Sequence, residues 1–116
     1  MLNTAIVTTT INIPYFLDDF SKNAIKYNHE NIKFYIIGDL KTPKEIKNYL
    51  NKLSLNYKFE YQYFDIDEQE HRLKDQKKLL EVIPYNSGSR KMLGNYIAYN
   101  DGADLLIQID DDNFIL

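Results

Sequence analysis

The chain contains no cysteine among its 116 residues. Disulfide bonds, thiolate nucleophiles and zinc sites built on cysteine are therefore excluded. It also lacks any run close to the roughly 18 consecutive apolar residues that a membrane-spanning helix requires. The first residues, MLNTAIVTTTINIP, have neither the basic leader nor the long apolar stretch of a signal peptide. We therefore expect a cytoplasmic protein with no transmembrane segment.

Glycine is scarce, with four residues in the chain, and the common glycine-rich phosphate loops are missing. Neither the dinucleotide-binding pattern GxGxxG nor the P-loop pattern GxxxxGK[ST] occurs, which argues against both of those enzyme classes. The stretch TTTINIPYF after the first expected strand holds neither a glycine nor a basic residue. A sugar-nucleotide nucleotidyltransferase needs both near that point, so it is the weaker of the enzyme alternatives.

The chain also has no strong excess of either charge, because 14 basic and 17 acidic residues are interspersed and leave a net charge of −3. Nucleic-acid binding requires a basic face, so this balance gives no reason to expect it. With 44% hydrophobic residues the composition is that of an ordinary globular protein. The length allows one domain, residues 1–116, around a single core.

Four β-rich apolar segments are predicted to be strands, at 4–10, 32–40, 58–66 and 103–109. Helices are predicted between them at about 14–27, 42–53, 68–83 and 90–101. In the first helix, Leu17, Phe20, Ala24 and Tyr27 should face the core. The second should start with a capping box, in which Thr42 caps and Glu45 reaches back. This order predicts a Rossmann-like α/β fold, with a mostly parallel sheet flanked by helices on both faces.

Polar residues follow every predicted strand. In open α/β sheets, ligands gather beyond the carboxyl ends of the strands, so these residues are the candidates for a site. They are Thr8, Thr9, Thr10 and Asn12 after the first strand, Asp39 after the second, Asp65 and Asp67 after the third, and Asp110, Asp111 and Asp112 after the fourth.

The run of three aspartates needs a positive partner, since three close carboxylates repel one another. Asp110 and Asp112 would point to the same side of a continuing strand, which suits a hard divalent cation with oxygen ligands. Such an ion would neutralise a diphosphate leaving group. Two alternatives stay open: the aspartates pair with a basic side chain, or they form a solvated turn at the strand end.

Residues 89–113, SRKMLGNYIAYNDGADLLIQIDDDN, resemble the nucleotide-sugar half of the GT-A glycosyltransferases. Those enzymes have a loop with an arginine, a helix with a small residue and an asparagine, and an apolar strand closed by Asp-x-Asp. The triple aspartate is similar to that of the reversibly glycosylated polypeptides, the UDP-arabinopyranose mutase family. The resemblance implies a metal-dependent glycosyltransferase that uses a nucleotide-diphosphate sugar as its donor. The expected donor is a UDP-sugar, and the expected metal cofactor is Mn²⁺ or Mg²⁺.

By position, the resemblance implies roles for several residues. Asp112 would bind the metal, and Asp110 would contact the ribose or complete the metal site. Thr8, Thr9 and Thr10 would line the nucleotide pocket, Asp39 would meet the uracil or ribose, Arg90 would face the base or diphosphate, and Asn95 would make a polar contact. Each has an ordinary alternative: threonines favour strands, Asp39 suits a turn, and Arg90 can relieve repulsion among the aspartates.

A complete GT-A enzyme continues well beyond its Asp-x-Asp motif. We therefore expect the chain to be part of a longer GT-A domain, with the catalytic residues outside it. The alternative is a small non-catalytic α/β binding module. A sheet whose last strand is also its exposed edge is prone to pair with another chain, so self-association through that edge is a further expectation.

Overall fold

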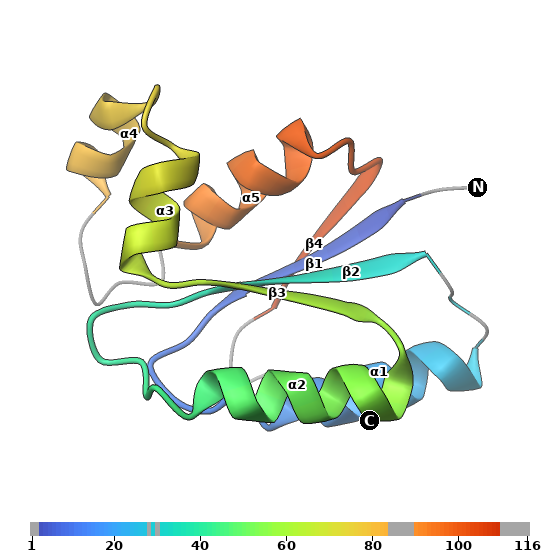
Figure 1. Cartoon of the computed structure of the whole chain (residues 1–116). Coiled ribbons are helices and arrows are strands. Elements are labelled where there is room, and N and C mark those ends of the chain that lie inside the picture. Colours follow the sequence, from blue (N-terminus) through green and yellow to red (C-terminus); the bar gives the residue numbers. More distant parts are fainter. Residues whose placement is uncertain (1–2, 28, 30, 84–89, 110–116) are drawn as a thin grey trace.

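The computed structural model of the chain describes residues 3–27, 29, 31–83 and 90–109 (Figure 1). The strands are β1 (Thr4–Thr9), β2 (Ile32–Ile37), β3 (Glu60–Phe64) and β4 (Leu105–Ile109). The helices are α1 (Phe16–Lys26), α2 (Ile46–Tyr57), α3 (Ile66–Arg72), α4 (Lys77–Val82) and α5 (Lys91–Asn100). No helix in the described ranges is both long enough and apolar enough to cross a membrane.

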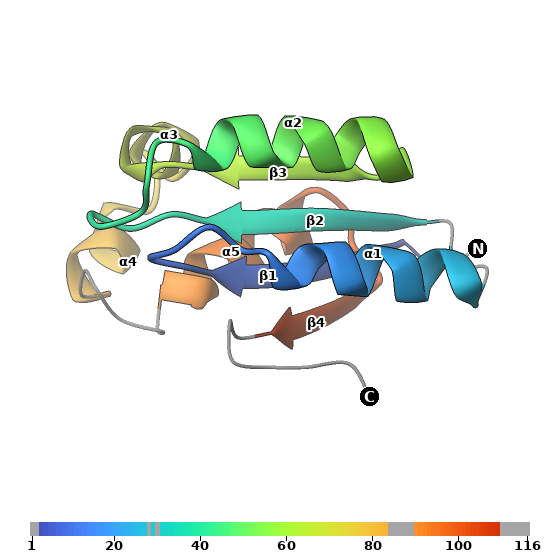
Figure 2. The same cartoon turned by 90° about the horizontal axis from the view of Figure 1, so that it is seen from below.

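The four strands form one sheet in the order β3-β2-β1-β4, and every neighbouring pair is parallel. The predicted α/β fold with a parallel sheet is therefore confirmed. Each strand is found within its predicted segment but is shorter. Helices α1 and α2 cover one face of the sheet, and α3, α4 and α5 lie on the other (Figures 1 and 2).

Alternation along β2 divides the core between the two faces of the sheet. Phe34 and Ile36 pack with the side chains of α1 and α2, whereas Tyr35 and Ile37 pack in the same cluster as side chains of α4 and α5. Successive side chains of a strand point to opposite faces, so an uninterrupted apolar strand must be covered on both sides. This is why the buried part of the strand, residues 34–37, is a continuous hydrophobic run.

The helix predicted over 68–83 is two helices, α3 and α4, so that prediction was wrong in extent. A turn follows α3, in which the N–H of Gln76 donates to the carbonyl of Leu73 at 2.8 Å. Between Leu73 and Leu79 the sequence offers no apolar side chain for a continuous helix to bury. The turn leaves the intervening polar residues at the surface and still places Leu73 and Ile83 in the core.

Two details of the predicted helix ends also differ. Tyr27 lies just beyond α1 and is 60% exposed, so it does not face the core. Helix α2 begins at Ile46 without a side-chain cap, and the Thr42 hydroxyl bonds elsewhere. The capping box was therefore wrong, because Thr42 lies in a loop that precedes the helix.

Helix α5 packs closely on the sheet because Gly94 has no side chain. A Cβ at this position would lie 2.6 Å from Cγ1 of Val7 and 2.8 Å from Cγ1 of Ile37. The helix ends at Asn100, and Gly102, two residues later, has a φ of +93°. The N–H groups of Gly102 and Ala103 return to the carbonyls of Tyr99 and Ala98, which closes a Schellman motif and turns the chain into β4.

Candidate functional site

The order of the strands fixes where a ligand site is expected. From β1 the chain moves outward through β2 to β3, and then returns to add β4 on the other side of β1. The direction of travel therefore reverses between β1 and β4. In open α/β sheets, ligands bind at such a reversal, beyond the carboxyl ends of the strands. The candidate site is the edge formed by the carboxyl ends of the strands.

The three predicted threonines lie at the end of β1, and their hydroxyl groups are used locally. Thr9 donates to the carbonyl of Ile37 at 2.9 Å, which ties the ends of β1 and β2 together. Thr10 donates to the carbonyl of Asn12 at 2.9 Å and accepts from its N–H at 3.0 Å. Thr8 is buried. These bonds hold the loop after β1 in a defined shape at the carboxyl edge.

Asp39 follows β2 in a turn, as its ordinary alternative predicted, and it is also 94% buried. Its Oδ1 accepts from the N–H of Leu40 at 2.8 Å. Among the described residues, none donates a hydrogen bond or forms an ion pair to its Oδ2. Asp39 lines the cavity described below, where water or a ligand can donate to this oxygen.

Thr42 joins the loops that follow β1 and β2. Its hydroxyl donates to the carbonyl of Thr10 at 2.6 Å and accepts from the N–H of Asp39 at 2.8 Å. One side chain therefore positions two of the predicted site residues. The sequence analysis missed this role, because TPKE also matches a helix start.

A cavity of about 420 Å³ opens beside Asp39, between the start of α2 and the carboxyl end of β3. Lys44 and Lys47 contribute to its wall from the α2 side, and Tyr63 and Asp65 from the β3 side. Asp65 caps α3 by accepting from the N–H of Glu68 at 2.8 Å, and it pairs with Lys47 at 3.8 Å. Burial raises the pKa of Tyr63, so its hydroxyl is protonated at neutral pH. The cavity thus combines acceptors, a donor and cations.

Arg90 is 98% buried just before α5. Its guanidinium donates to the carbonyl of Ile83 at 3.2 Å and to the side-chain oxygen of Gln69. The amide of Gln69 in turn donates to the carbonyls of Gly38 and Phe64, both at 2.8 Å. The described bonds of Arg90 therefore anchor the start of α5 to the ends of β2 and β3. Its predicted contact with a nucleotide stays a prediction.

Asn95 lies on α5, one residue after the glycine that contacts the sheet. Its side-chain oxygen is buried and accepts no hydrogen bond from the described part of the chain. Its predicted contact with a nucleotide stays a prediction.

The aspartates Asp110, Asp111 and Asp112 lie outside the described residues, as does any metal site they form. Within the described residues, no three His, Asp or Glu side chains are grouped so that they could hold a metal ion.

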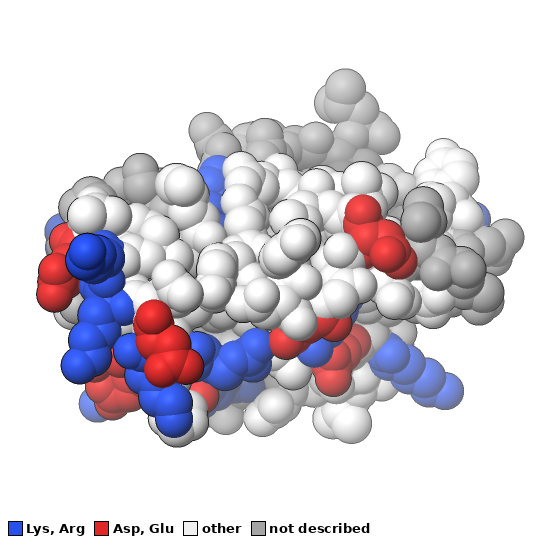
Figure 3. Space-filling model, turned by 90° about the horizontal axis from the view of Figure 1, so that it is seen from above, with Lys and Arg blue, Asp and Glu red and all other residues white. Residues whose placement is uncertain are grey.

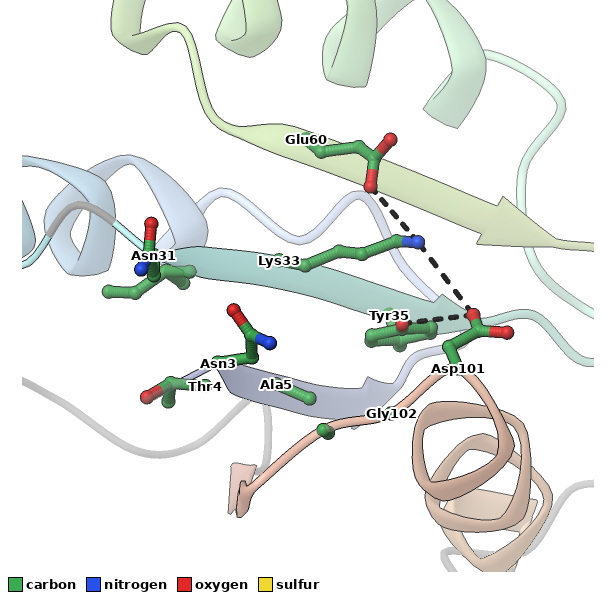
Figure 4. Close-up of a pocket in the computed structure, with 11 residues that line it drawn as sticks. Asn3, Thr4, Ala5, Asn31, Lys33, Tyr35, Glu60, Asp101 and Gly102 are labelled. Carbon is green, nitrogen blue, oxygen red and sulfur yellow. Dashed lines mark hydrogen bonds and ion pairs between the residues drawn. The ribbon is translucent and has the colours of Figure 1, made fainter. Parts of the chain in front are cut away.

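A second cavity, of about 280 Å³, lies at the amino ends of the strands (Figure 4). There the Lys33 ammonium lies 3.0 Å from Glu60 and 3.7 Å from Asp101, and the Tyr35 hydroxyl donates to Asp101 at 3.0 Å. Partial burial lowers the pKa of Lys33, but its hydrogen bond to Glu60 and its interactions with Tyr35 outweigh burial and raise it. Burial and the bond to Asp101 raise the pKa of Tyr35. The charges here satisfy one another, and this cavity lies away from the strand reversal.

Gln69 is the other residue that the sequence analysis missed. It lies in a highly charged segment, where a polar residue is ordinarily solvated, and nothing local distinguishes it.

A comparison of the chain with models of protein families gives no match, and a comparison with curated proteins gives none either.

Proposed function

We propose that the chain is the nucleotide-binding half of a metal-dependent cytoplasmic glycosyltransferase, which uses a UDP-linked sugar as its donor. The observation that carries this proposal is the strand order. The reversal between β1 and β4 directs a ligand to the ends of those two strands. Asp110, the first of the three aspartates, follows β4 directly.

The polar groups at this edge suit a nucleoside. The Oδ2 of Asp39 can accept a hydrogen bond from a base N–H or a ribose hydroxyl, and none of the described residues occupies it. Asp39 is held in place through Thr42, so its carboxylate is oriented before a ligand arrives. A preoriented acceptor in a cavity discriminates between ligands that donate to it and ligands that do not.

Asp110 and Asp112 are the proposed ligands of Mn²⁺ or Mg²⁺. The metal, when bound, would neutralise charge on the diphosphate as the bond to the sugar breaks. Four other residues have positioning roles. Thr9 and Thr42 fix the loops, and Arg90 and Gln69 anchor the start of α5 to the ends of β2 and β3.

Paramagnetic broadening by Mn²⁺ tests the location of the site. In the presence of UDP, Mn²⁺ should broaden the amide signals of Thr9, Thr10 and Asp39 at the carboxyl ends of the strands. The signals of Asn31 and Lys33, at the amino ends, should stay sharp and serve as a control within the same spectrum.

Two matched variants complete this experiment. Asp112→Asn should abolish the broadening, whereas Asp104→Asn, at the other end of β4, should leave it unchanged. Broadening centred on Lys33 would place the metal at the amino-edge cavity and contradict the proposal. So would broadening that survives in Asp112→Asn.

A further inference from the structure

The outer edge of β4 has the features of a pairing surface. β4 is the last strand of the sheet order, and no described residue pairs with its outer side. Leu105, Leu106 and Ile107, the first three residues of the strand, are 46%, 38% and 40% exposed. The strand, LLIQI, carries no charged residue. It therefore exposes apolar side chains on both faces together with open backbone groups.

The opposite edge of the same sheet is protected. β3 begins with the charged Glu60, and α2 packs along it. In Figure 2, α2 lies in front of β3 and α1 in front of β1, whereas β4 lies to the side of both helices. On the face covered by α3, α4 and α5, the charged side chains gather mostly toward the β3 side (Figure 3). Natural edge strands are normally protected by charge or by covering elements, and the described residues give β4 little of either.

The ladder between β1 and β4 shows which backbone groups face outward. The N–H of Leu105 donates to the carbonyl of Asn3, so Leu105 and Ile107 turn their backbone groups toward β1. Consecutive residues of a strand alternate in this respect. The N–H and C=O groups of Leu106 and Gln108 consequently point to the open edge.

We propose that two copies of the chain associate by antiparallel pairing of their β4 strands, with the two-fold axis at Leu106. Leu106 of one copy then lies opposite Leu106 of the other, and the two residues exchange backbone hydrogen bonds. Leu105 lies opposite Ile107, so the exposed apolar side chains cover one another. The two sheets become one continuous sheet. This inference does not rest on the proposed function.

Charge distinguishes this register from the one with its axis at Ile107. With the axis at Leu106, Asp104 lies opposite Gln108, whose side-chain amide can donate to the carboxylate. With the axis at Ile107, Asp104 would lie opposite position 110, which in the sequence is another aspartate. Like charges directly opposite in an antiparallel pair are destabilising. Pairing through Leu106 is the register of these two that avoids such a contact.

A charge-swap experiment tests both the dimer and its register. Sedimentation equilibrium over a range of concentrations should show the wild-type chain passing from monomer to dimer. Leu106→Lys and Leu106→Glu should each be monomeric at concentrations where the wild type is dimeric, because each puts two like charges at the axis. An equimolar mixture of the two variants should restore the dimer, since the charges across the axis are then opposite.

The control is Leu55→Lys, which changes an 81% exposed leucine on α2 and should leave the dimer intact. Circular dichroism of each variant establishes that it is folded. A wild-type chain that stays monomeric at the highest concentration would overturn the proposal and leave the edge to a different partner. A dimer that survives Leu106→Lys, or a mixture that stays monomeric, would also overturn it.

Discussion

Gln69 and Arg90 form a buried pair that ties α3 and the start of α5 to the carboxyl ends of two strands. The guanidinium of Arg90 donates to the side-chain oxygen of Gln69, and the Gln69 amide donates to the carbonyls of Gly38 and Phe64. Gly38 follows β2 directly and Phe64 ends β3. The shape of the candidate site therefore depends on a glutamine that has no place in any sequence motif.

Replacement of Gln69 by leucine should destabilise the fold. Leucine is of similar size but leaves two backbone carbonyls and the guanidinium of Arg90 without this partner, inside the core. We expect the free energy of unfolding to fall by about 2–4 kcal/mol, measured by urea denaturation. Gln76→Leu, at an exposed position before α4, is the control and should change it little. Equal effects of the two substitutions would contradict the role given to Gln69.

The carboxylate of Asp39 should matter more for ligand binding than for stability. Asp39→Asn keeps an oxygen for the N–H of Leu40 but replaces the other carboxylate oxygen with an amide group that cannot accept. Loss of a charged acceptor should weaken UDP binding by roughly 10- to 100-fold. The thermal unfolding midpoint should change little. Asp19→Asn, an exposed acid on α1, should leave binding unchanged, and an equal loss in both variants would count against a specific contact.

An added methyl group at Gly94 should disturb the packing of α5. Alanine favours a helix by about 1 kcal/mol over glycine. Its Cβ would nevertheless meet Val7 and Ile37 at less than van der Waals distance. We expect the steric effect to prevail and Gly94→Ala to lower the free energy of unfolding by about 1–3 kcal/mol. Val7→Ala makes room on the sheet, so the double variant should lose less than the sum of the two single losses. Simple additivity would show that Gly94 does not need this space.

The contact between Asp18 and Tyr57 predicts a pH dependence of stability. The Tyr57 hydroxyl donates to Asp18 at 2.5 Å, and this bond, with help from Lys22, lowers the pKa of Asp18 below its ordinary 3.8 despite partial burial. A lowered pKa in the folded state means that the unfolded chain takes up the proton first. The stabilisation is therefore complete above pH 3.8 and is lost as the pH falls through the folded pKa.

Tyr57→Phe should raise the pKa of Asp18, measured by NMR titration of its carboxyl carbon. It should also reduce the loss of stability between neutral and acidic pH. Tyr27→Phe, at an exposed position after α1, is the control and should leave the titration of Asp18 unchanged. An unchanged pKa of Asp18 in Tyr57→Phe would show that the hydrogen bond is not the cause.

The elements that follow from local chemistry were predictable. The β-branched and apolar runs around Val7 and Ile36 predict buried strands, and both residues are buried. The alternation of such runs with helical patterns predicts a parallel sheet. The break between α3 and α4 was missed because Leu73 and Leu80 are seven residues apart. That spacing is compatible with one continuous helix and equally with two short helices. Thr42 was misassigned because the same four residues satisfy a capping box and a loop.

The candidate site was predictable only in outline. Asp39 and the threonines could be placed at the carboxyl edge, since each follows a strand. The burial of Asp39, the cavity beside it and the bridge formed by Thr42 depend on contacts between loops that are distant in sequence. Arg90 was noticed for its charge, whereas its partner Gln69 carries no such signal. Tertiary hydrogen bonds of this kind cannot be inferred from spacing.

Calorimetric titration of the chain with UDP, with and without Mn²⁺, tests the central claim most directly. We predict binding that requires Mn²⁺, is lost in Asp112→Ala and is retained in Asp111→Ala, whose side chain would point away on a continuing strand. UDP binding that is independent of the metal, or unchanged in Asp112→Ala, would contradict the account. So would the absence of binding by a chain whose circular dichroism shows that it is folded.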